Sequence, residues 1–461
     1  MKVDLVVRGQ RVFTPVGERP AAIHIDRTWG TIVAVADIDA MPEPTLGSKP
    51  QVIDAGSHCI LPGLVDTHVH INEPGRTEWE GFETATRAAA AGGVTTLVDM
   101  PLNSVPPTTT LEGLRAKVKA LEEKARVDVA LCGGLVPSTA GKGALEELWS
   151  EGVLAFKCFL AESGVDEFSH VHESELRAGM AELARIDAPL FVHAELPAPL
   201  AEGEKAALGL DPRRYATYLA SRPRRAEDAA IELVLRLAQE TGARAHVVHL
   251  SSSDAVTMFR KAKDQKIQLT VETCPHYLTF AAEDIPDGAT EFKCAPPIRE
   301  RNNRENLWDA LRQGVIDQVV TDHSPSTVEL KCSGSGDFMK AWGGISSLQL
   351  GLAAIWTEAK ARGRSVRDVV EWMSAAPARL AGLADRKGAI AAGHDADLVI
   401  WDPDADFTVD VSTLEHRNKI TPYHARKLLG STLRTILRGE TIYERGQGFG
   451  PTRRGRWVRR A

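Results

Sequence analysis

The chain has 461 residues, 43% of them hydrophobic and 25% charged, with a formal net charge of −7. These proportions allow a large buried core, and the negative charge disfavours a nucleic acid or an anionic membrane surface as a partner. The six cysteines are scattered without a CxxC pair, no signal peptide is found, and no apolar stretch is long enough to span a membrane, so we expect a cytoplasmic protein without disulfides.

Both ends of the chain show the short alternating runs that are typical of β-strands. β-Branched and other apolar residues alternate with polar ones, and Gly and Pro separate the runs. The runs cover residues 4–15, 21–27 and 31–37 at one end and 395–410 and 431–446 at the other. These β-rich ends bracket a middle section with a different pattern.

The middle section alternates short apolar runs with helical stretches such as residues 81–93, 111–125 and 226–242. The runs that we expect to be strands are residues 61–70, 94–100, 127–135, 153–160, 189–196, 245–251, 267–278 and 317–325. Because eight strand–helix units of this length favour parallel βα connections, the sequence predicts an α/β fold, a closed (β/α)8 TIM-like barrel over residues 61–387.

Two longer polar segments, residues 202–225 and 324–345, interrupt this pattern. We interpret both as loops. In a barrel, the loops that follow the strands cover the face that carries the active site. These two segments are therefore expected to lie over that face.

Side chains that can bind metals occur at or near the carboxyl ends of the predicted strands, which converge on one face of a barrel. They are His68, His70, Lys157, His193, His249 and Asp322. Each taken alone has a structural interpretation: a hydrogen-bonded core histidine, a lysine whose stem covers apolar surface, or an aspartate that caps a helix. Taken together, imidazole and carboxylate groups in this order suit Zn²⁺ or a similar divalent ion.

Other histidines do not fit this pattern. His170 and His172 repeat the HxH spacing, but polar residues flank them and a helical pattern follows, so we interpret them as a loop. His246 lies three residues before His249, and strand alternation places these two side chains on opposite faces. We therefore expect His246 to be structural or to support the site without binding metal.

Lys157 requires chemistry of its own, because an ammonium group repels a cation. Burial in an apolar strand lowers the pKa of a lysine, and the neutral amine can add CO₂ to form a carbamate. We hypothesise that carboxylated Lys157 supplies an anionic oxygen that bridges two metal ions, so that the six ligands serve two sites.

Motifs along nearly the whole chain resemble those of the cyclic amidohydrolases, the family of dihydroorotase, hydantoinase, dihydropyrimidinase and allantoinase. The motifs are GLVDTHVHINEPG, FKCF, FVHAE, HVVHLSS, CPHYL, KCAPPIR and VVTDHSP. The resemblance implies that residues 1–60 and 388–461 pair into a small β-sandwich beside the barrel. It also implies that the six residues above bind two divalent ions, zinc or alternatively cobalt, manganese or iron, and that the protein is a homo-oligomer, a homotetramer.

Within the family, three features separate the members. Dihydroorotases carry an arginine that grips a substrate carboxylate where this chain has Asn72. Hydantoinases and dihydropyrimidinases carry a tyrosine soon after the metal lysine, and KCFLAESG contains none. The segments EPGR, WEG, MPLN, PPTT and GGISSLQLGL resemble the allantoinase members, which open the hydantoin ring of allantoin to give allantoate in purine and ureide catabolism.

The metal pair and Asp322 predict a hydrolytic mechanism in which a bridging hydroxide attacks the ring amide, while Asp322 accepts the proton and returns it to the leaving nitrogen. We expect substrate contacts from Asn72, Asn103, Cys294 and Gly344. Alternatively, Asn103 caps a turn. For Cys294, the alternative is a reactive thiol. Two other functions remain open: a hydantoinase or dihydropyrimidinase acting on related cyclic ureides or imides, and an inactive relative that acts as a binding protein.

Overall fold

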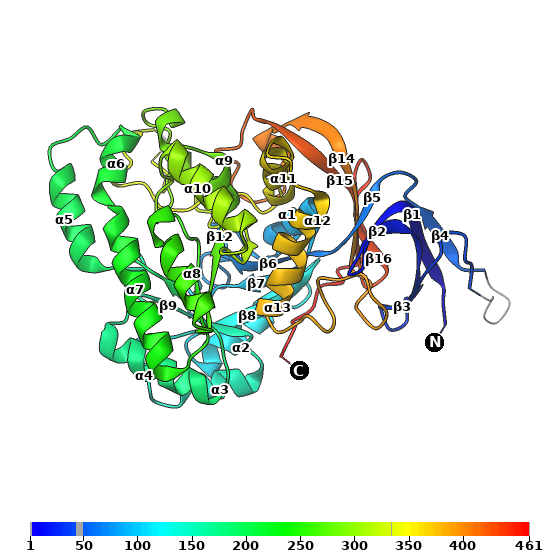
Figure 1. Cartoon of the computed structure of the whole chain (residues 1–461), viewed down its shortest axis with the longest axis horizontal. Coiled ribbons are helices and arrows are strands. Elements are labelled where there is room, and N and C mark those ends of the chain that lie inside the picture. The colour runs from blue at the N-terminus through cyan, green and yellow to red at the C-terminus, as the bar shows by residue number, and fades with distance from the viewer. Residues whose placement is uncertain (1, 43–48, 333, 461) are drawn as a thin grey trace.

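The computed structural model describes residues 2–42, 49–332 and 334–460. Figure 1 shows two parts: strands surrounded by helices, and a β-rich part beside them to which both ends of the chain contribute. Among the described residues, no helix combines the length and the apolar character that crossing a membrane requires.

Eight parallel strands form the barrel, in the order β13, β12, β11, β10, β9, β8, β7 and β6. A parallel bridge between Val69 and His323 joins the two edges, and the His70 N–H donates to the His323 carbonyl oxygen at 2.9 Å. The strands are β6 (Leu64–Val69), β7 (Val94–Asp99), β8 (Asp128–Gly134), β9 (Ala155–Phe159), β10 (Leu190–His193), β11 (Ala245–Val247), β12 (Leu269–Thr273) and β13 (Gln318–Val319). The predicted (β/α)8 barrel is confirmed.

Helices cover the outside of these strands, and α1 illustrates why the sequence folds this way: its alanines favour the helix, and Gly93 ends it with a left-handed φ of 87°. The helices are α1 (Phe82–Gly92), α2 (Leu111–Leu121), α3 (Ala144–Glu151), α4 (Glu173–Arg185), α5 (Pro197–Ala207), α6 (Tyr215–Ser221), α7 (Arg224–Thr241), α8 (Val256–Asp264), α9 (Pro275–Thr279), α10 (Arg301–Arg312), α11 (Gly351–Ala361), α12 (Val366–Val370) and α13 (Ala376–Leu380). Short 3-10 turns are η1 (Ser253–Ala255), η2 (Ala282–Asp284), η3 (Thr290–Phe292) and η5 (Val411–Thr413), and η4 (Glu371–Ala375) is a π-helical turn.

The interpretation of residues 202–225 as a loop is wrong, because α5 and α6 occupy much of this segment. Tertiary contacts explain the short helix α6: Tyr215 and Tyr218 are buried, and their hydroxyls donate to the carbonyl oxygens of Ile298 at 2.9 Å and of Cys294 at 2.6 Å. Residues 324–345 do form a loop, since their described part contains no helix and no strand beyond a bridge at residue 345.

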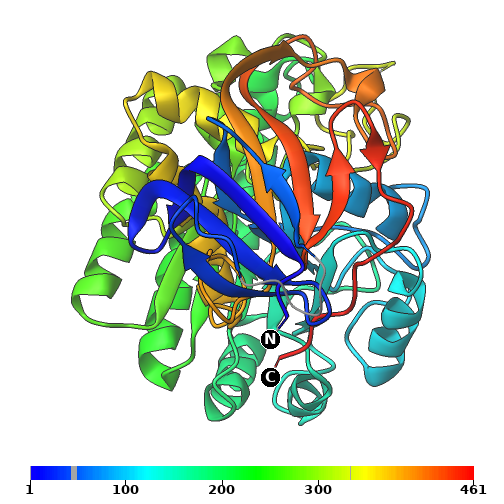
Figure 2. The ribbon, with the colours of Figure 1, turned by 90° about the vertical axis from the view of Figure 1, so that its right-hand side faces the viewer.

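The two chain ends form one mixed sheet of nine strands, ordered β17, β16, β15, β14, β5, β1, β2 and β3, with β4 paired to β1. The strands are β1 (Leu5–Thr14), β2 (Gly17–Asp26), β3 (Thr31–Ala36), β4 (Gln51–Asp54), β5 (Cys59–Pro62), β14 (Leu398–Thr408), β15 (Lys427–Leu437), β16 (Glu440–Glu444) and β17 (Gly448–Phe449). Antiparallel pairing of β5 with β14 joins the N-terminal strands to the C-terminal ones, blue beside orange and red in Figure 2.

This β-domain has a core of its own, in which Ile23, Ile60, Leu398 and Ile436 are buried together. The predicted small domain built from the β-strands of both chain ends is thereby confirmed; where the sequence predicted a β-sandwich, the strands belong to one mixed sheet. Its exact division from the barrel, at residues 60/61 and 387/388, stays a prediction.

A buried ion cluster fastens the β-domain to the barrel. Lys387 Nζ lies 2.7 Å from Asp128 Oδ2, 2.6 Å from Asp397 Oδ2 and 2.9 Å from Asp395 Oδ2, and its side chain is fully buried. Asp128 begins β8 and also pairs with Arg438, which directly follows β15. Although burial opposes the charge, the three carboxylates raise the pKa of Lys387 above its ordinary value.

Replacing Lys387 with Met leaves these carboxylates without their central cation. Removing one partner from a buried ion pair costs about 3–5 kcal/mol, so we expect Lys387→Met to lower the denaturant midpoint of unfolding markedly. Lys360→Met is the control, because Lys360 makes an exposed pair with Asp404 and a cation–π contact with Trp356 rather than a buried ion cluster, and exposed pairs contribute little. Equal midpoints for the two variants would contradict the proposed role of the cluster.

Candidate metal centre

The six predicted ligand residues lie at one end of the barrel. They come from β6, β9 and β10 and from the segments that directly follow β6, β11 and β13, and all six line one cavity of about 240 Å³. The cavity is the space into which the carboxyl ends of the strands open. The structure thus brings together His68, His70, Lys157, His193, His249 and Asp322.

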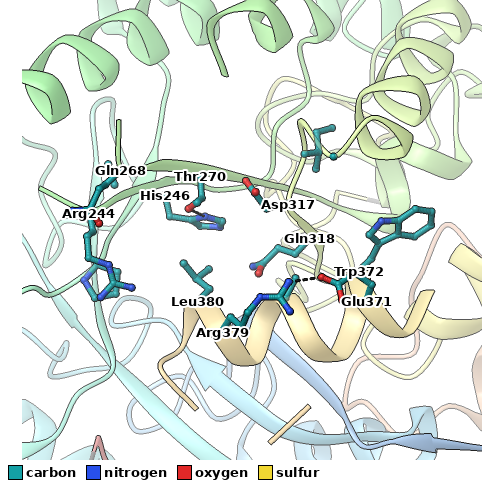
Figure 3. Close-up of a pocket in the computed structure, with 15 residues that line it drawn as sticks. Arg244, His246, Gln268, Thr270, Asp317, Gln318, Glu371, Trp372, Arg379 and Leu380 are labelled. Atoms are coloured by element: carbon teal, nitrogen blue, oxygen red, sulfur yellow. Dashed lines mark hydrogen bonds and ion pairs between the residues drawn. The ribbon is translucent and has the colours of Figure 1, made fainter. Parts of the chain in front are cut away.

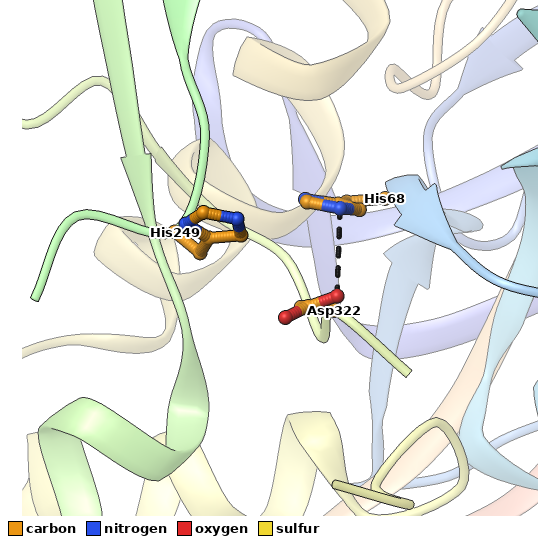
Figure 4. Close-up of side chains that lie close together, drawn as sticks. All are labelled: His68, His249 and Asp322. Carbon is orange, nitrogen blue, oxygen red and sulfur yellow. Dashed lines mark ion pairs between the residues drawn. The ribbon is translucent and has the colours of Figure 1, made fainter. Parts of the chain in front are cut away.

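His68, His249 and Asp322 form a compact group, in which one ligand atom from each residue lies within 4.8 Å of the others (Figure 4). His68 Nε2 lies 3.4 Å from Asp322 Oδ1, and His70 Nε2 lies 3.5 Å from the same oxygen. His193 reaches the group through His249, since its Nδ1 lies 3.0 Å from His249 Nε2. Four imidazoles and one carboxylate therefore face a common space.

Left-handed backbone conformations occur at two of these ligand residues and at two of the expected substrate contacts. Asn72 (φ 64°), Asn103 (φ 62°), His249 (φ 43°) and Asp322 (φ 44°) have positive φ, which residues other than glycine rarely adopt. The turn at His249 breaks the strand alternation, so the expected placement of His246 on the opposite face is wrong. Instead, His246 faces the barrel interior beneath the centre and is a supporting residue, as expected, without lining the cavity.

Lys157 is fully buried in β9, and its Nζ has no hydrogen-bond partner among the described residues. Burial lowers the pKa of Lys157 to about 8, although Asp322 and Glu272 oppose the shift. A fraction of this lysine is therefore a neutral amine near neutral pH, which is the form that adds CO₂. Carboxylation of Lys157 stays a prediction.

Unpaired buried atoms test whether these residues suit a metal. Besides Lys157 Nζ, His68 Nε2 and His249 Nδ1 lack a hydrogen-bond partner in the described part of the chain, although buried polar atoms nearly always have one. Burial lowers the pKa of His70 to about 4 and that of His249 well below its ordinary value, which favours the neutral imidazole that metal binding requires. The residues present therefore fit a divalent ion.

Two buried glutamates contact the ring nitrogens of ligand histidines, and neither glutamate was predicted from the sequence. Glu272 Oε1 lies 2.6 Å from His68 Nδ1, and Glu195 Oε2 lies 2.9 Å from His193 Nε2. Although burial raises the pKa of each carboxyl group, Arg222 beside Glu195 and His68 beside Glu272 outweigh it, and both pKa values fall to about 2. The signal that could have found Glu272 is a charged residue inside the apolar strand run LTVET.

Asp66 connects the first strand to the last ligand. Its carboxylate accepts hydrogen bonds from the Thr321 hydroxyl at 2.6 Å, the Thr321 N–H at 3.2 Å and the His68 N–H at 3.1 Å. Burial raises the pKa of Asp66 to about 6. Because Thr321 directly precedes Asp322, these contacts fix His68 and Asp322 relative to each other.

A second group of donor atoms shares Asp322. Cys274, His276 and Asp322 each place one ligand atom within 4.8 Å of the others. Within the described chain, neither ring nitrogen of His276 has a hydrogen-bond partner, and burial lowers its pKa to about 4. His276 belongs to the CPHYL motif, to which sequence reasoning assigned no ligand.

Three of the four expected substrate contacts, Asn103, Cys294 and Gly344, line the cavity. Asn72 is not among the lining residues, and its side-chain amide donates to the Pro325 carbonyl oxygen at 3.3 Å. Burial raises the pKa of the Cys294 thiol to about 12, which disfavours the reactive-thiol alternative. Substrate binding by these residues stays a prediction.

The second HxH pair lies outside the centre. His172 is the N-cap of α4, and its N–H donates to Glu175 Oε2 at 2.9 Å, while His170 Nδ1 lies 3.2 Å from Glu162 Oε1. Neither histidine lines the cavity. The interpretation of this pair as a loop before a helix is confirmed.

The sequence profile of the "Amidohydrolase family" matches residues 59–441, most of the chain. This chain belongs to the amidohydrolase family. It is 54% identical over 445 residues to an allantoinase from Streptomyces avermitilis, with 96% of each chain covered. It is also 44% identical to an allantoinase from Arabidopsis thaliana, over 96% of this chain and 88% of that one, and 44% identical to one from Saccharomyces cerevisiae, over 94% of each.

Solved structures of other amidohydrolases have the same fold. An L-hydantoinase (dihydropyrimidinase) from Arthrobacter aurescens superimposes with a TM-score of 0.92 at 31% identity, covering 100% of both chains. A dihydropyrimidinase from Brevibacillus agri gives a TM-score of 0.88 at 30% identity, over 99% of this chain and 98% of that one. The resemblance to cyclic amidohydrolases, and with it the prediction of a hydrolase, is confirmed.

Replacing Lys157 with Ala tests the hypothesis of a bridging carbamate. Without an anionic oxygen between the two ions, we expect Lys157→Ala to bind half the metal of the wild type or none, as elemental analysis after dialysis would show. In the wild type, native mass spectrometry should detect one added CO₂ that mild acid removes, since carbamates lose CO₂ when protonated. Unchanged metal content in Lys157→Ala would rule the carbamate out.

Proposed function

We propose that this amidohydrolase is an allantoinase, which hydrolyses the ring amide of allantoin to give allantoate in purine and ureide catabolism. The observation that carries the proposal is a complete set of ligand-type side chains around one cavity, in a chain 54% identical over 96% of its length to an allantoinase. We further propose a cytoplasmic homotetramer that acts on a small cyclic ureide, with no nucleic acid or membrane partner.

Two divalent ions, zinc or alternatively cobalt, manganese or iron, would supply a hydroxide at neutral pH and polarise the ring carbonyl. His68, His70, His193, His249 and Asp322 would hold them, and carboxylated Lys157 would bridge them. The neutral imidazoles and the unpaired donor atoms described above support this assignment.

In this proposal Asp322 moves the proton. Burial alone would raise its pKa, but the neighbouring histidines lower it well below its ordinary value, so the group is a carboxylate that can accept a proton. The Ser324 hydroxyl donates to Asp322 Oδ1 at 2.6 Å and orients the group. In the reaction, water adds to the amide carbon, its proton passes to Asp322, and the same proton reaches the ring nitrogen as the C–N bond breaks.

Neither Asn72 nor Arg222 offers a free guanidinium to a ring carboxylate of a substrate. At the position of the arginine found in dihydroorotases, Asn72 is turned away to Pro325. Arg222, which does line the cavity, donates to both carboxylate oxygens of Glu195, at 3.1 Å from its Nε and 2.5 Å from its Nη2, and is not free to grip a second carboxylate.

A hydantoinase or dihydropyrimidinase is the second candidate, because such an enzyme superimposes along the whole chain. One observation argues against it. The hydroxyl of Tyr218, in the cavity wall, donates to the Cys294 carbonyl oxygen at 2.6 Å and so does not donate to a substrate oxyanion. The third candidate, an inactive binding protein, has no need of the complete set of donor side chains.

A hydrolysis panel distinguishes these candidates. We expect the zinc-loaded enzyme to hydrolyse allantoin with a kcat/KM roughly 100-fold above that for hydantoin, dihydrouracil or dihydroorotate, since a site that hydrogen-bonds a substrate group rejects analogues without it. A preference for hydantoin or dihydrouracil would favour the second candidate. No turnover of any of the four by metal-loaded protein would favour the third.

The proton-transfer role predicts the behaviour of Asp322→Asn. The amide keeps the shape and one donor oxygen but cannot take up the proton, so kcat should fall by about 10²- to 10⁴-fold. Elemental analysis should show that most of the metal is retained. Full activity in this variant would exclude Asp322 as the proton carrier.

A further inference from the structure

A layer of polar side chains crosses the barrel interior beneath the metal centre. Its members come from β6, β11, β12 and β13, and each is at most 1% exposed. They are Thr67, His68, His246, Glu272 and Gln318. Branched apolar residues usually fill a barrel interior, and buried polar groups cost free energy unless they are hydrogen-bonded, so the contacts of this layer show what it does.

Glu272 is the centre of the layer and accepts three hydrogen bonds. Its Oε1 accepts from His68 Nδ1 at 2.6 Å, and its Oε2 accepts from His246 Nε2 at 2.9 Å and from Gln318 Nε2 at 3.0 Å. Gln318 Nε2 is also 2.9 Å from the Thr67 hydroxyl oxygen. Four strands thus contribute one connected network, and Glu272 joins its parts.

These contacts select one tautomer of His68. An ionised carboxylate only accepts hydrogen bonds, so Nδ1 of His68 carries a proton, and in the neutral ring that metal binding requires Nε2 carries the lone pair. Nε2 is the atom that lacks a hydrogen-bond partner in the described structure and lies 3.4 Å from Asp322 Oδ1. Glu272 therefore directs the lone pair of His68 toward the metal centre.

The network continues away from the metal centre. His246 Nδ1 lies within hydrogen-bond distance of the Thr270 hydroxyl, at 2.8 Å, and both residues line another cavity, of about 450 Å³, together with Gln318 (Figure 3). This cavity lies beside the amino-terminal parts of β11, β12 and β13, and the π-helical turn η4 forms part of its wall. His246 is thus held between this far cavity and Glu272.

We propose that Glu272 is a positioning residue of the metal centre, which fixes the tautomer and orientation of His68, and that His246 fixes Glu272 in turn. The proposal rests on the metal-binding role proposed for His68 but not on the identity of the substrate. A carboxylate behind an imidazole also makes its free nitrogen a stronger ligand, and loss of such a partner typically lowers metal affinity about 10- to 100-fold.

The test measures metal binding without substrate. The wild type, Glu272→Gln and His246→Gln are stripped of metal and titrated with zinc against a chromophoric chelator, and their cobalt-loaded forms are compared by absorption spectroscopy. We expect about 10- to 100-fold weaker binding of at least one ion and a changed cobalt spectrum in Glu272→Gln. His246→Gln should lose less, because Glu272 then keeps His68 and Gln318. The double variant should be less affected than the sum of the two changes, because both act through one network.

A matched control is Glu182→Gln, since Glu182 is equally buried but lies on α4, outside the strands of the barrel. It should bind zinc like the wild type, and the metal-free variants should be compared by their unfolding midpoints. If Glu272→Gln does not fold, a changed cobalt spectrum in His246→Gln with an unchanged midpoint supports the proposal. Wild-type affinity and spectrum in a folded Glu272→Gln would overturn it. If the wild type itself bound no metal, the proposed function would fail as well.

Discussion

A histidine directs the lone pair of one ring nitrogen toward a metal site when a hydrogen bond fixes its other ring nitrogen. In this protein Glu272 holds His68 and Glu195 holds His193, at 2.6 and 2.9 Å. Because both carboxylates are fully buried, they in turn need partners, and Arg222 provides one for Glu195. The need to orient a few imidazoles therefore explains why buried polar residues occur inside the barrel, beside apolar side chains such as Phe191, whose ring centroid lies 5.0 Å from that of His246.

Closure of the barrel serves the same need. The ligands come from both the first strand and the segment after the last, so the two must be held in register. The bridge between Val69 and His323 and the hydrogen bonds from Thr321 to Asp66 do this within a few residues of His68 and Asp322. The left-handed φ of 44° at Asp322 is unfavourable by itself, by about 1–3 kcal/mol, and it persists because the barrel closes around it.

The order of strands and the ligand-type residues could be predicted from the sequence, because both follow local patterns: apolar runs of strand length, and polar residues at their ends. Other features depend on contacts between distant residues. His68 and Glu272 are 204 positions apart, and α6 is stabilised by tyrosines that reach residues far along the chain. The orientation of His246 could not be predicted either, because strand alternation fails where a single residue, His249, turns left-handed.

The loop over residues 324–345 contributes to the cavity wall, and hydrogen bonds and an aromatic contact connect it to the rest of the structure. Lys331 Nζ is buried and donates to the carbonyl oxygens of Lys293 and Trp342, both at 3.0 Å, and to that of Gly344. Trp342 packs edge-on against Trp79 of the WEG motif, with ring centroids 4.8 Å apart. The buried Lys331 side chain thus ties the described part of this loop to neighbouring segments, and Trp79 of the WEG motif contacts the cavity wall through Trp342.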